Sequence, residues 1–196
     1  MGLFQGSINY VEYVPTKKID YQNIESLFEV EIISPLTMED LNKESIGWCN
    51  YNTGETDKTV SSVLGGFMVG FRIDSKKVPR VPLNMAAAEA QKELKREEGE
   101  KSVAYRKRVK ELRSDIEDKM IREIFPSIKI VEVFFDQENN RVYFGAAGKA
   151  INDRFKIKIY DTLGIGLLRN TFGTNPMIAH GISFQTVSGW CPREKF

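Results

Sequence analysis

Apolar and polar positions in the first third of the chain predict strands separated by one helix. Residues 4–14 carry apolar side chains on both sides of Glu12, which is typical of a largely buried strand. The segment DYQNIESLFE places its apolar residues at helical spacing, and its first residue, Asp20, is a candidate N-cap. Residues 29–62 are polar and rich in turn formers around Trp48, so we expect a long loop there, with at most one short helical turn.

The middle of the chain changes from a strand pattern to a helical one. VLGGFMVGFRID, residues 63–74, predicts a strand whose glycines indicate close backbone approach or a bulge. After KKVPRVP, residues 84–98 and 102–124 are dominated by helix formers, with a break at EGEKS. Between Leu94 and Val103 the sequence offers no apolar side chain to bury. We therefore expect this helical pair to protrude as an arm.

The remaining pattern predicts strands around one more helix. SIKIVEVFFD and RVYFGAA predict two strands joined by a hairpin turn at QENN. GKAINDRFKIKIYDTLG predicts a helix ended by Gly164, and MIAHGISFQTV predicts a last strand. This order predicts an α+β fold with a mainly antiparallel sheet covered by helices. We expect an α+β body from residues 1–78 and 127–196, with residues 79–126 inserted as the protruding charged helical hairpin.

Composition restricts where a charged partner can bind. The chain has 196 residues, 41% of them hydrophobic, and a formal net charge of +1, so any surface for nucleic acid must be local. The longest apolar run, residues 60–71, is too short and too rich in glycine and serine to span a bilayer. Nothing at the start resembles an export signal, so we expect a soluble cytoplasmic protein without a membrane partner. Cys49 and Cys191 lack metal-type spacing, and we expect free thiols.

Positive charge is concentrated in KSVAYRKRVKELR, residues 101–113. This segment carries six cationic side chains and one acidic one, Glu111. The acidic residues of the same predicted helix follow residue 114. Cations near a helix N-terminus oppose the helix dipole, so their concentration there favours a partner that supplies negative charge. The alternative is a solvated helix that pairs with Glu93, Glu97 and Glu98, although exposed pairs contribute only about 0–1 kcal/mol.

The phosphate backbone of duplex DNA is the expected partner of this segment. Phosphate contacts carry no base information, and the sequence has no motif for reading bases, so binding is expected to be independent of DNA sequence. Three further cations lie near the base of the arm. The candidate DNA-binding residues are Lys76, Lys77, Arg80, Lys101, Arg106, Lys107, Arg108, Lys110 and Arg113.

The sequence offers no pattern for catalysis, and we predict no catalytic residue, metal site or cofactor. His180 stands alone within a predicted strand and is read as structural. A nuclease would have to draw Asp74, Glu132 and Asp136 from strand ends, and their spacing does not support one. A further hypothesis is a protein-interaction module, such as a phage or mobile-element factor, whose arm binds an acidic protein partner.

The order of short motifs resembles that of the recombination-associated RdgC proteins. MGLFQGSINYVEY, IGWCNY, FRIDSKKVPRVPLN, LRSDIEDKMIREIFP, FFDQENNRVYFGAAGKA and YDTLGIGLL follow one another as in that family, over most of residues 1–170. Two departures are Ser127 and Lys129, where the family has arginine and phenylalanine, and a sequence that ends before the family's C-terminal third. The matching positions are Gly47, Trp48, Arg72, Lys76, Pro79, Pro126, Asp136, Leu163 and Gly164.

The resemblance implies a non-catalytic protein that binds double-stranded DNA without sequence preference. Family members form ring-shaped homodimers that encircle duplex DNA and restrain a RecA-type recombinase, so a homodimer and a nucleoid-associated location are implied. For this short form, we expect ring closure to be absent or to be achieved differently. Carrying the family pattern over adds Arg72 to the candidate DNA-binding residues and places Lys76 and the charged helices towards DNA or the subunit gate.

Overall fold

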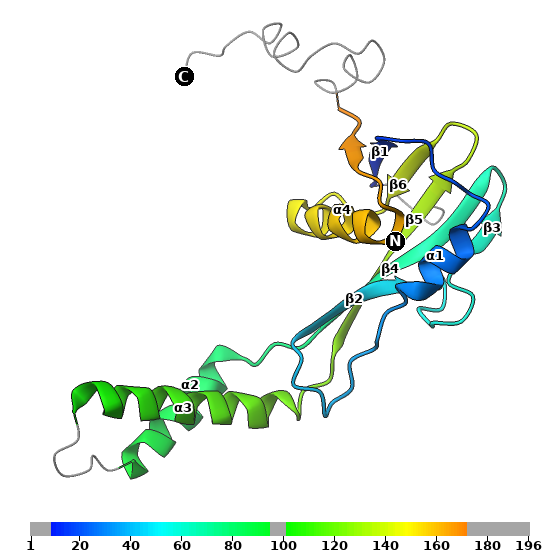
Figure 1. Cartoon of the computed structure of the whole chain (residues 1–196). Coiled ribbons are helices and arrows are strands. Elements are labelled where there is room, and N and C mark those ends of the chain that lie inside the picture. Colours follow the sequence, from blue (N-terminus) through cyan, green and yellow to red (C-terminus); the bar gives the residue numbers. More distant parts are fainter. Residues whose placement is uncertain (1–8, 95–100, 172–196) are drawn as a thin grey trace, which may run out of the picture. The chain divides into compact units, whose positions relative to one another are not determined.

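The fold is α+β, as the sequence pattern predicts (Figure 1). A computed structural model of the chain describes residues 9–94 and 101–171. Within these residues there are four helices and one seven-stranded sheet. The strands are β1 Val11–Pro15, β2 Glu44–Cys49, β3 Ser61–Val63, β4 Gly66–Ser75, β5 Ser127–Asp136, β6 Arg141–Phe144 and β7 Leu167–Arg169. The helices are α1 Ile24–Val30, α2 Arg80–Glu93, α3 Ser102–Ile121 and α4 Lys149–Leu163.

The strand order is β2-β4-β5-β6-β1-β7, with β3 paired to β4. The pairs β1–β6, β1–β7, β3–β4 and β5–β6 are antiparallel. The predicted hairpin turn at QENN is confirmed between β5 and β6. Its local cause is visible: the Asp136 carboxylate accepts the Asn139 backbone N–H at 2.9 Å, and Asn140 takes a positive φ of 50°.

Two N-terminal predictions are wrong in detail. The sequence pattern predicts a loop over residues 29–62, but β2 lies within it and β3 begins there. The last residues of β2 are buried because β2 pairs with β4, a neighbour that local polarity does not reveal. The helix expected to begin at Asp20 begins at Ile24, with Asn23 as the N-cap residue. Asp20 instead accepts the Gln22 backbone N–H at 3.0 Å, which is a turn rather than a cap.

Other element ends also differ from the prediction. Helix α2 begins at Arg80, four residues before the predicted start, because a proline is tolerated in a first helical turn. Helix α4 ends as predicted, with Gly164 in the left-handed region at φ 64°. Strand β7 was not part of the predicted pattern; it is a three-residue strand that pairs with β1. The predicted last strand, His180, Cys191 and residues 4–8 lie outside the described residues.

The described residues form two compact units. Unit 1 contains residues 9–33, 47–72 and 130–171. Unit 2 contains residues 34–46, 73–94 and 101–129, and therefore includes α2 and α3. In the part of the chain that the structure describes, no helix is long and apolar enough to cross a bilayer.

Unit 1 is held by an aromatic core beneath α1 and α4. Phe28 of α1 meets Trp48 of β2 edge-to-face at 4.8 Å between ring centroids. Phe155 of α4 stacks on Phe144 of β6 at 4.0 Å, and Trp48 Nε1 donates to Thr162 Oγ1 at 2.8 Å. Gly47 is required beside this tryptophan, because a Cβ there would lie 2.4 Å from the Cα of Ile33. Both helices thus cover the same aromatic layer.

Unit 2 has a small apolar core of its own. Val78, Leu83 and Ile121 are buried together, at the start of α2 and the end of α3. The partly buried residues packed against them are Ile116, Met120 and Ile124. Ile121 is the one buried residue of α3, so the N-terminal half of that helix contributes nothing to this core. Tyr105 and Val109 of this half are only half-buried.

Candidate nucleic-acid interface

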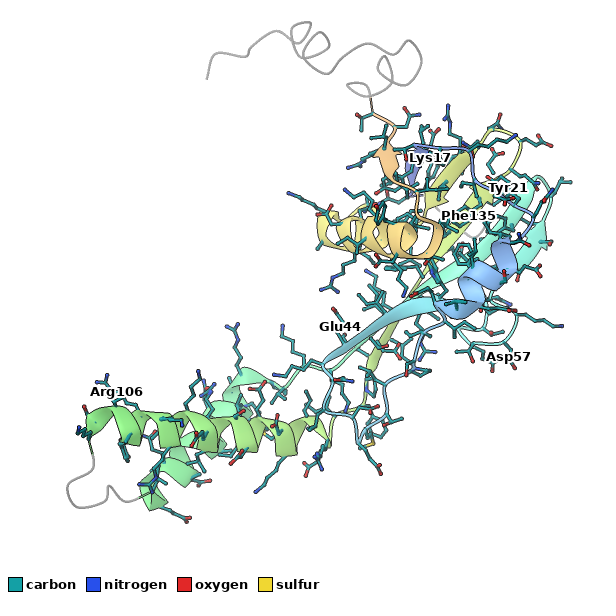
Figure 2. The ribbon with its side chains drawn as sticks, viewed as in Figure 1. Lys17, Tyr21, Glu44, Asp57, Arg106 and Phe135 are labelled. Atoms are coloured by element: carbon teal, nitrogen blue, oxygen red, sulfur yellow. The ribbon has the colours of Figure 1, made fainter. Side chains whose placement is uncertain are left out.

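The basic segment forms the N-terminal half of α3. Lys101 is the N-cap residue, and the helix begins at Ser102. Arg106, Lys110 and Arg113 follow at spacings of four and three, which places them on one face of the helix. Figure 2 labels Arg106 near the N-terminal end of α3. The exposed cations of this segment are Lys101, Arg106, Lys107, Lys110 and Arg113, while Arg108 is half-buried.

We call the exposed cations of this segment the basic face, and two contacts within the described residues involve them without neutralising much of their charge. The ion pair between Lys107 and Glu111 is long at 3.6 Å, and both side chains are well exposed, so it is weak. Arg113 donates to the Asn84 side-chain oxygen at 2.8 Å, which fixes the guanidinium without neutralising it. Asn84 lies on α2, and no sequence pattern predicted its contact with Arg113. Of the three predicted acidic partners, Glu93 is exposed, and the other two lie outside the described residues.

The C-terminal half of α3 has the opposite character. Asp115, Glu117 and Asp118 follow the basic half directly. Glu117 forms an ion pair with Lys43, which comes from residues 34–46 of the same unit. The helix therefore changes sign along its length, and a polyanion is attracted to its first half and repelled by its second.

Lys76 requires a correction, because it is not an exposed cation. Its side chain is 3% exposed, and Nζ donates to the backbone carbonyls of Met38 at 2.8 Å and Asp40 at 2.6 Å. Hydrogen bonds from Thr37 lower the pKa of the Asp40 carboxyl, and the charge of Lys76 lowers it further. Lys76 thus anchors residues 34–43 to the end of β4 and cannot meet a phosphate.

The other cations outside α3 differ from one another. Lys77 and Arg80 are exposed at the start of α2, in the same unit as α3. Arg72 belongs to unit 1, where its guanidinium donates to the carbonyl of Gly54 at 2.7 Å and supports a turn. We therefore assign a structural role to Arg72 and keep Lys77 and Arg80 with the basic face.

Neighbouring lysines give a matched test of this assignment. We expect Lys76→Met to lower the free energy of unfolding by about 1–3 kcal/mol, because two partly buried carbonyls lose their donor. The Lys76→Met variant should bind DNA with an unchanged salt dependence. Lys77→Met should leave stability unchanged and make the slope of log affinity against log salt shallower by about 0.9. Urea denaturation and DNA titration of both variants check the pair, and the reverse pattern would contradict the assignment.

Two of the three carboxylates considered for a nuclease, Asp74 and Asp136, are engaged in local structure. Asp74 is buried and accepts the Leu36 backbone N–H at 3.2 Å within unit 2. Asp136 belongs to unit 1 and accepts two hydrogen bonds from Asn139, from the backbone at 2.9 Å and from the side chain at 2.8 Å. Among the described residues, no three histidine, cysteine, aspartate or glutamate side chains form a group that could hold a metal ion.

Comparison with known proteins agrees with the motif order in the sequence. A search of curated proteins found no match. A family model described as "RdgC: Putative exonuclease, RdgC" matches residues 9–177, which include both units and the whole basic segment. Because the match covers most of the 196 residues, the chain belongs to the RdgC family.

Proposed function

We propose that the protein binds duplex DNA without sequence preference, through the exposed cations of α3, and acts by occupying DNA rather than by chemistry. The observation that carries the proposal is the set of five exposed cations within residues 101–113, accompanied by one acidic residue. Membership of the RdgC family supports a recombination-associated role. A location on the nucleoid in the cytoplasm is part of the proposal.

The spacing of the basic residues suits a phosphate backbone. Arg113 follows Arg106 by seven positions, which corresponds to about 10 Å along an α-helix. Phosphates on one strand of a duplex follow one another at about 3.4 Å along its axis, so such a row can meet several of them. The long, flexible side chains allow this contact on any sequence, because every base pair carries the same phosphates.

A homodimer would strengthen this binding. Two copies present two basic faces, and the second contact becomes intramolecular once the first is made. Duplex DNA held in this way is less accessible to a RecA-type recombinase, which gives a physical route to restraining recombination. Light scattering with and without a short duplex tests the dimer. A strand-exchange reaction with a RecA-type recombinase tests the restraint, which should disappear when the basic face is neutralised.

The direct test is a titration of fluorescent duplexes of unrelated sequence at rising salt. If about five of the seven exposed cations of residues 101–113 and the start of α2 contact phosphates at one time, log affinity should fall with log salt at a slope of about −4 to −5. The affinities for the different sequences should agree. Binding that is insensitive to salt, or confined to one sequence, contradicts the proposal.

Two other functions have specific support and are tested separately. The basic face also fits an acidic protein partner. A complex with such a partner that survives nuclease treatment in a pull-down would favour a protein-interaction module over a DNA-binding protein. The family description contains the word exonuclease, so linear duplex DNA should be incubated with the protein and Mg²⁺ or Mn²⁺. We expect no shortened DNA product. If one appeared, the protein would act as a nuclease rather than by occupying DNA.

A further inference from the structure

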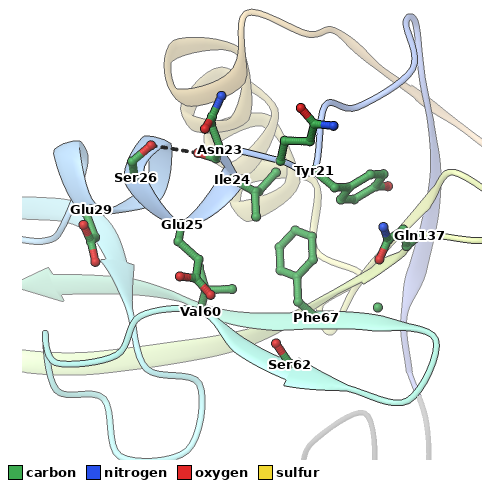
Figure 3. A pocket seen from close by; sticks show the side chains of 12 residues that line it. Tyr21, Asn23, Ile24, Glu25, Ser26, Glu29, Val60, Ser62, Phe67 and Gln137 are labelled. Carbon is green, nitrogen blue, oxygen red and sulfur yellow. Dashed lines mark hydrogen bonds between the residues drawn. The ribbon is translucent and has the colours of Figure 1, made fainter.

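A second candidate site lies in unit 1, away from the residues assigned to DNA binding. A hollow of about 550 Å³ opens between α1 with its preceding turn, the β3–β4 hairpin, and the turn after β5 (Figure 3). Tyr21 and Phe67 line its interior, and Glu25 and Glu29 line one side. Among the residues that the structure describes, no lysine, arginine or histidine lines this hollow.

The charge of the hollow is negative. Glu25 and Glu29 are four residues apart on α1, so they lie on the same side of the helix, and both are exposed. The carboxylate of Asp136 also acts on Tyr21: burial first, and this charge second, raise the pKa of the Tyr21 phenol to about 12. The phenol therefore keeps its proton at neutral pH. An anionic ligand would be repelled here, whereas a cation would be attracted.

The aromatic side chains add a second feature that favours a cation. Tyr21 and Phe67 meet edge-to-face, with 5.8 Å between ring centroids. Phe67 is buried and stacks one face on Phe135 at 4.5 Å, so the half-buried ring of Tyr21 is the more accessible of the two. The faces of aromatic rings attract ammonium and guanidinium groups, most effectively beside a carboxylate. An organic cation can contact the Tyr21 ring and the two glutamates together.

Uncharged polar groups suit the backbone of a peptide. Ser62 and Gln137 line the part of the hollow opposite α1, and both are exposed. A serine hydroxyl and a side-chain amide can each donate and accept, as peptide N–H and C=O groups require. The hollow is also larger than one arginine side chain needs. We propose that it binds an arginine or lysine side chain presented by a protein partner, together with the adjoining backbone.

This inference does not depend on the DNA proposal, since it concerns unit 1 and the opposite charge. The probe is the peptide acetyl-Gly-Gly-Arg-Gly-Gly-amide, titrated into ¹⁵N-labelled protein. The uncharged control is the same peptide with citrulline in place of arginine. We expect amide shifts at Ser26, Ser62 and Phe67, and much weaker shifts with citrulline. Acetyl-arginine amide, which lacks the flanking backbone, should bind more weakly than the full peptide.

Matched glutamate pairs make the test specific. Glu25→Gln with Glu29→Gln should weaken peptide binding about three- to tenfold, because two partly screened ion pairs are lost. Glu89→Gln with Glu93→Gln removes the same charge at the same spacing from α2, and should leave peptide binding unchanged. Equal binding of arginine and citrulline peptides, shifts located elsewhere, or an equal loss in both variants would each overturn the inference. Unchanged DNA affinity in the Glu25 and Glu29 variant would show that the two proposals stand independently.

Discussion

Reversing the charge of Arg106, Lys107 and Lys110 to glutamate is expected to weaken duplex binding by about a hundredfold or more at low salt. Each lost phosphate contact removes the release of roughly one counterion, and each new carboxylate adds repulsion. The three residues are exposed on α3 and contribute no buried surface, so the fold should be retained. The loss should be equal for duplexes of unrelated sequence, measured by fluorescence anisotropy.

The control for this variant carries the same charge change in unit 1. Lys17, Lys18 and Lys149 are also exposed, and their reversal to glutamate alters net charge by the same amount. We expect this control to lose much less affinity, because its cations are not part of the basic face. Equal losses in the two variants would show that net charge, rather than α3, governs binding. A loss confined to one DNA sequence would contradict phosphate recognition.

Replacing Phe155 by alanine is expected to cost about 3–5 kcal/mol of the free energy of unfolding. Its ring is fully buried, stacks on Phe144 at 4.0 Å and also contacts Trp48 and Phe71. A domain of this kind is stable by only about 5–15 kcal/mol, so the variant is close to unfolding. Urea denaturation measures the change, and Phe155→Leu, which leaves a smaller cavity, should fall between the variant and the wild type.

Ile157 supplies the comparison on the same helix. Its side chain is 63% exposed, so Ile157→Ala should change stability by less than about 0.5 kcal/mol. Similar losses for Phe155→Ala and Ile157→Ala would contradict the placement of α4 over the aromatic core. The pair therefore tests which face of α4 is buried, independently of DNA binding.

Local signals in the sequence predicted the elements that local chemistry determines. The turn at QENN follows from an aspartate that binds the backbone three residues later, and Gly164 ends α4 because glycine tolerates positive φ. The helices of unit 2 follow from a run of helix formers that ends before Pro126. The predicted arrangement of this pair as a protruding arm stays a prediction.

The local sequence pattern could not predict contacts between segments that are distant along the chain. Strand β2 is stabilised by pairing with β4, a neighbour from a later part of the chain. Because polar residues precede and follow β2, the local pattern indicated a loop. Lys76 reads as one more cation beside Lys77, but its partners are carbonyls 36 and 38 residues earlier in the chain. The hollow in unit 1 joins three separate segments of the sequence, and no spacing within any one of them reveals it.

The account depends most on phosphate contacts made by α3, and one comparison tests it most directly. The slope of log affinity against log salt should be measured for the wild type and for Arg106→Gln, Lys107→Gln and Lys110→Gln combined. Loss of three contacts predicts a slope that is shallower by about 2.7, with the fold intact. An unchanged slope would show that α3 does not contact the DNA backbone, and would contradict the account.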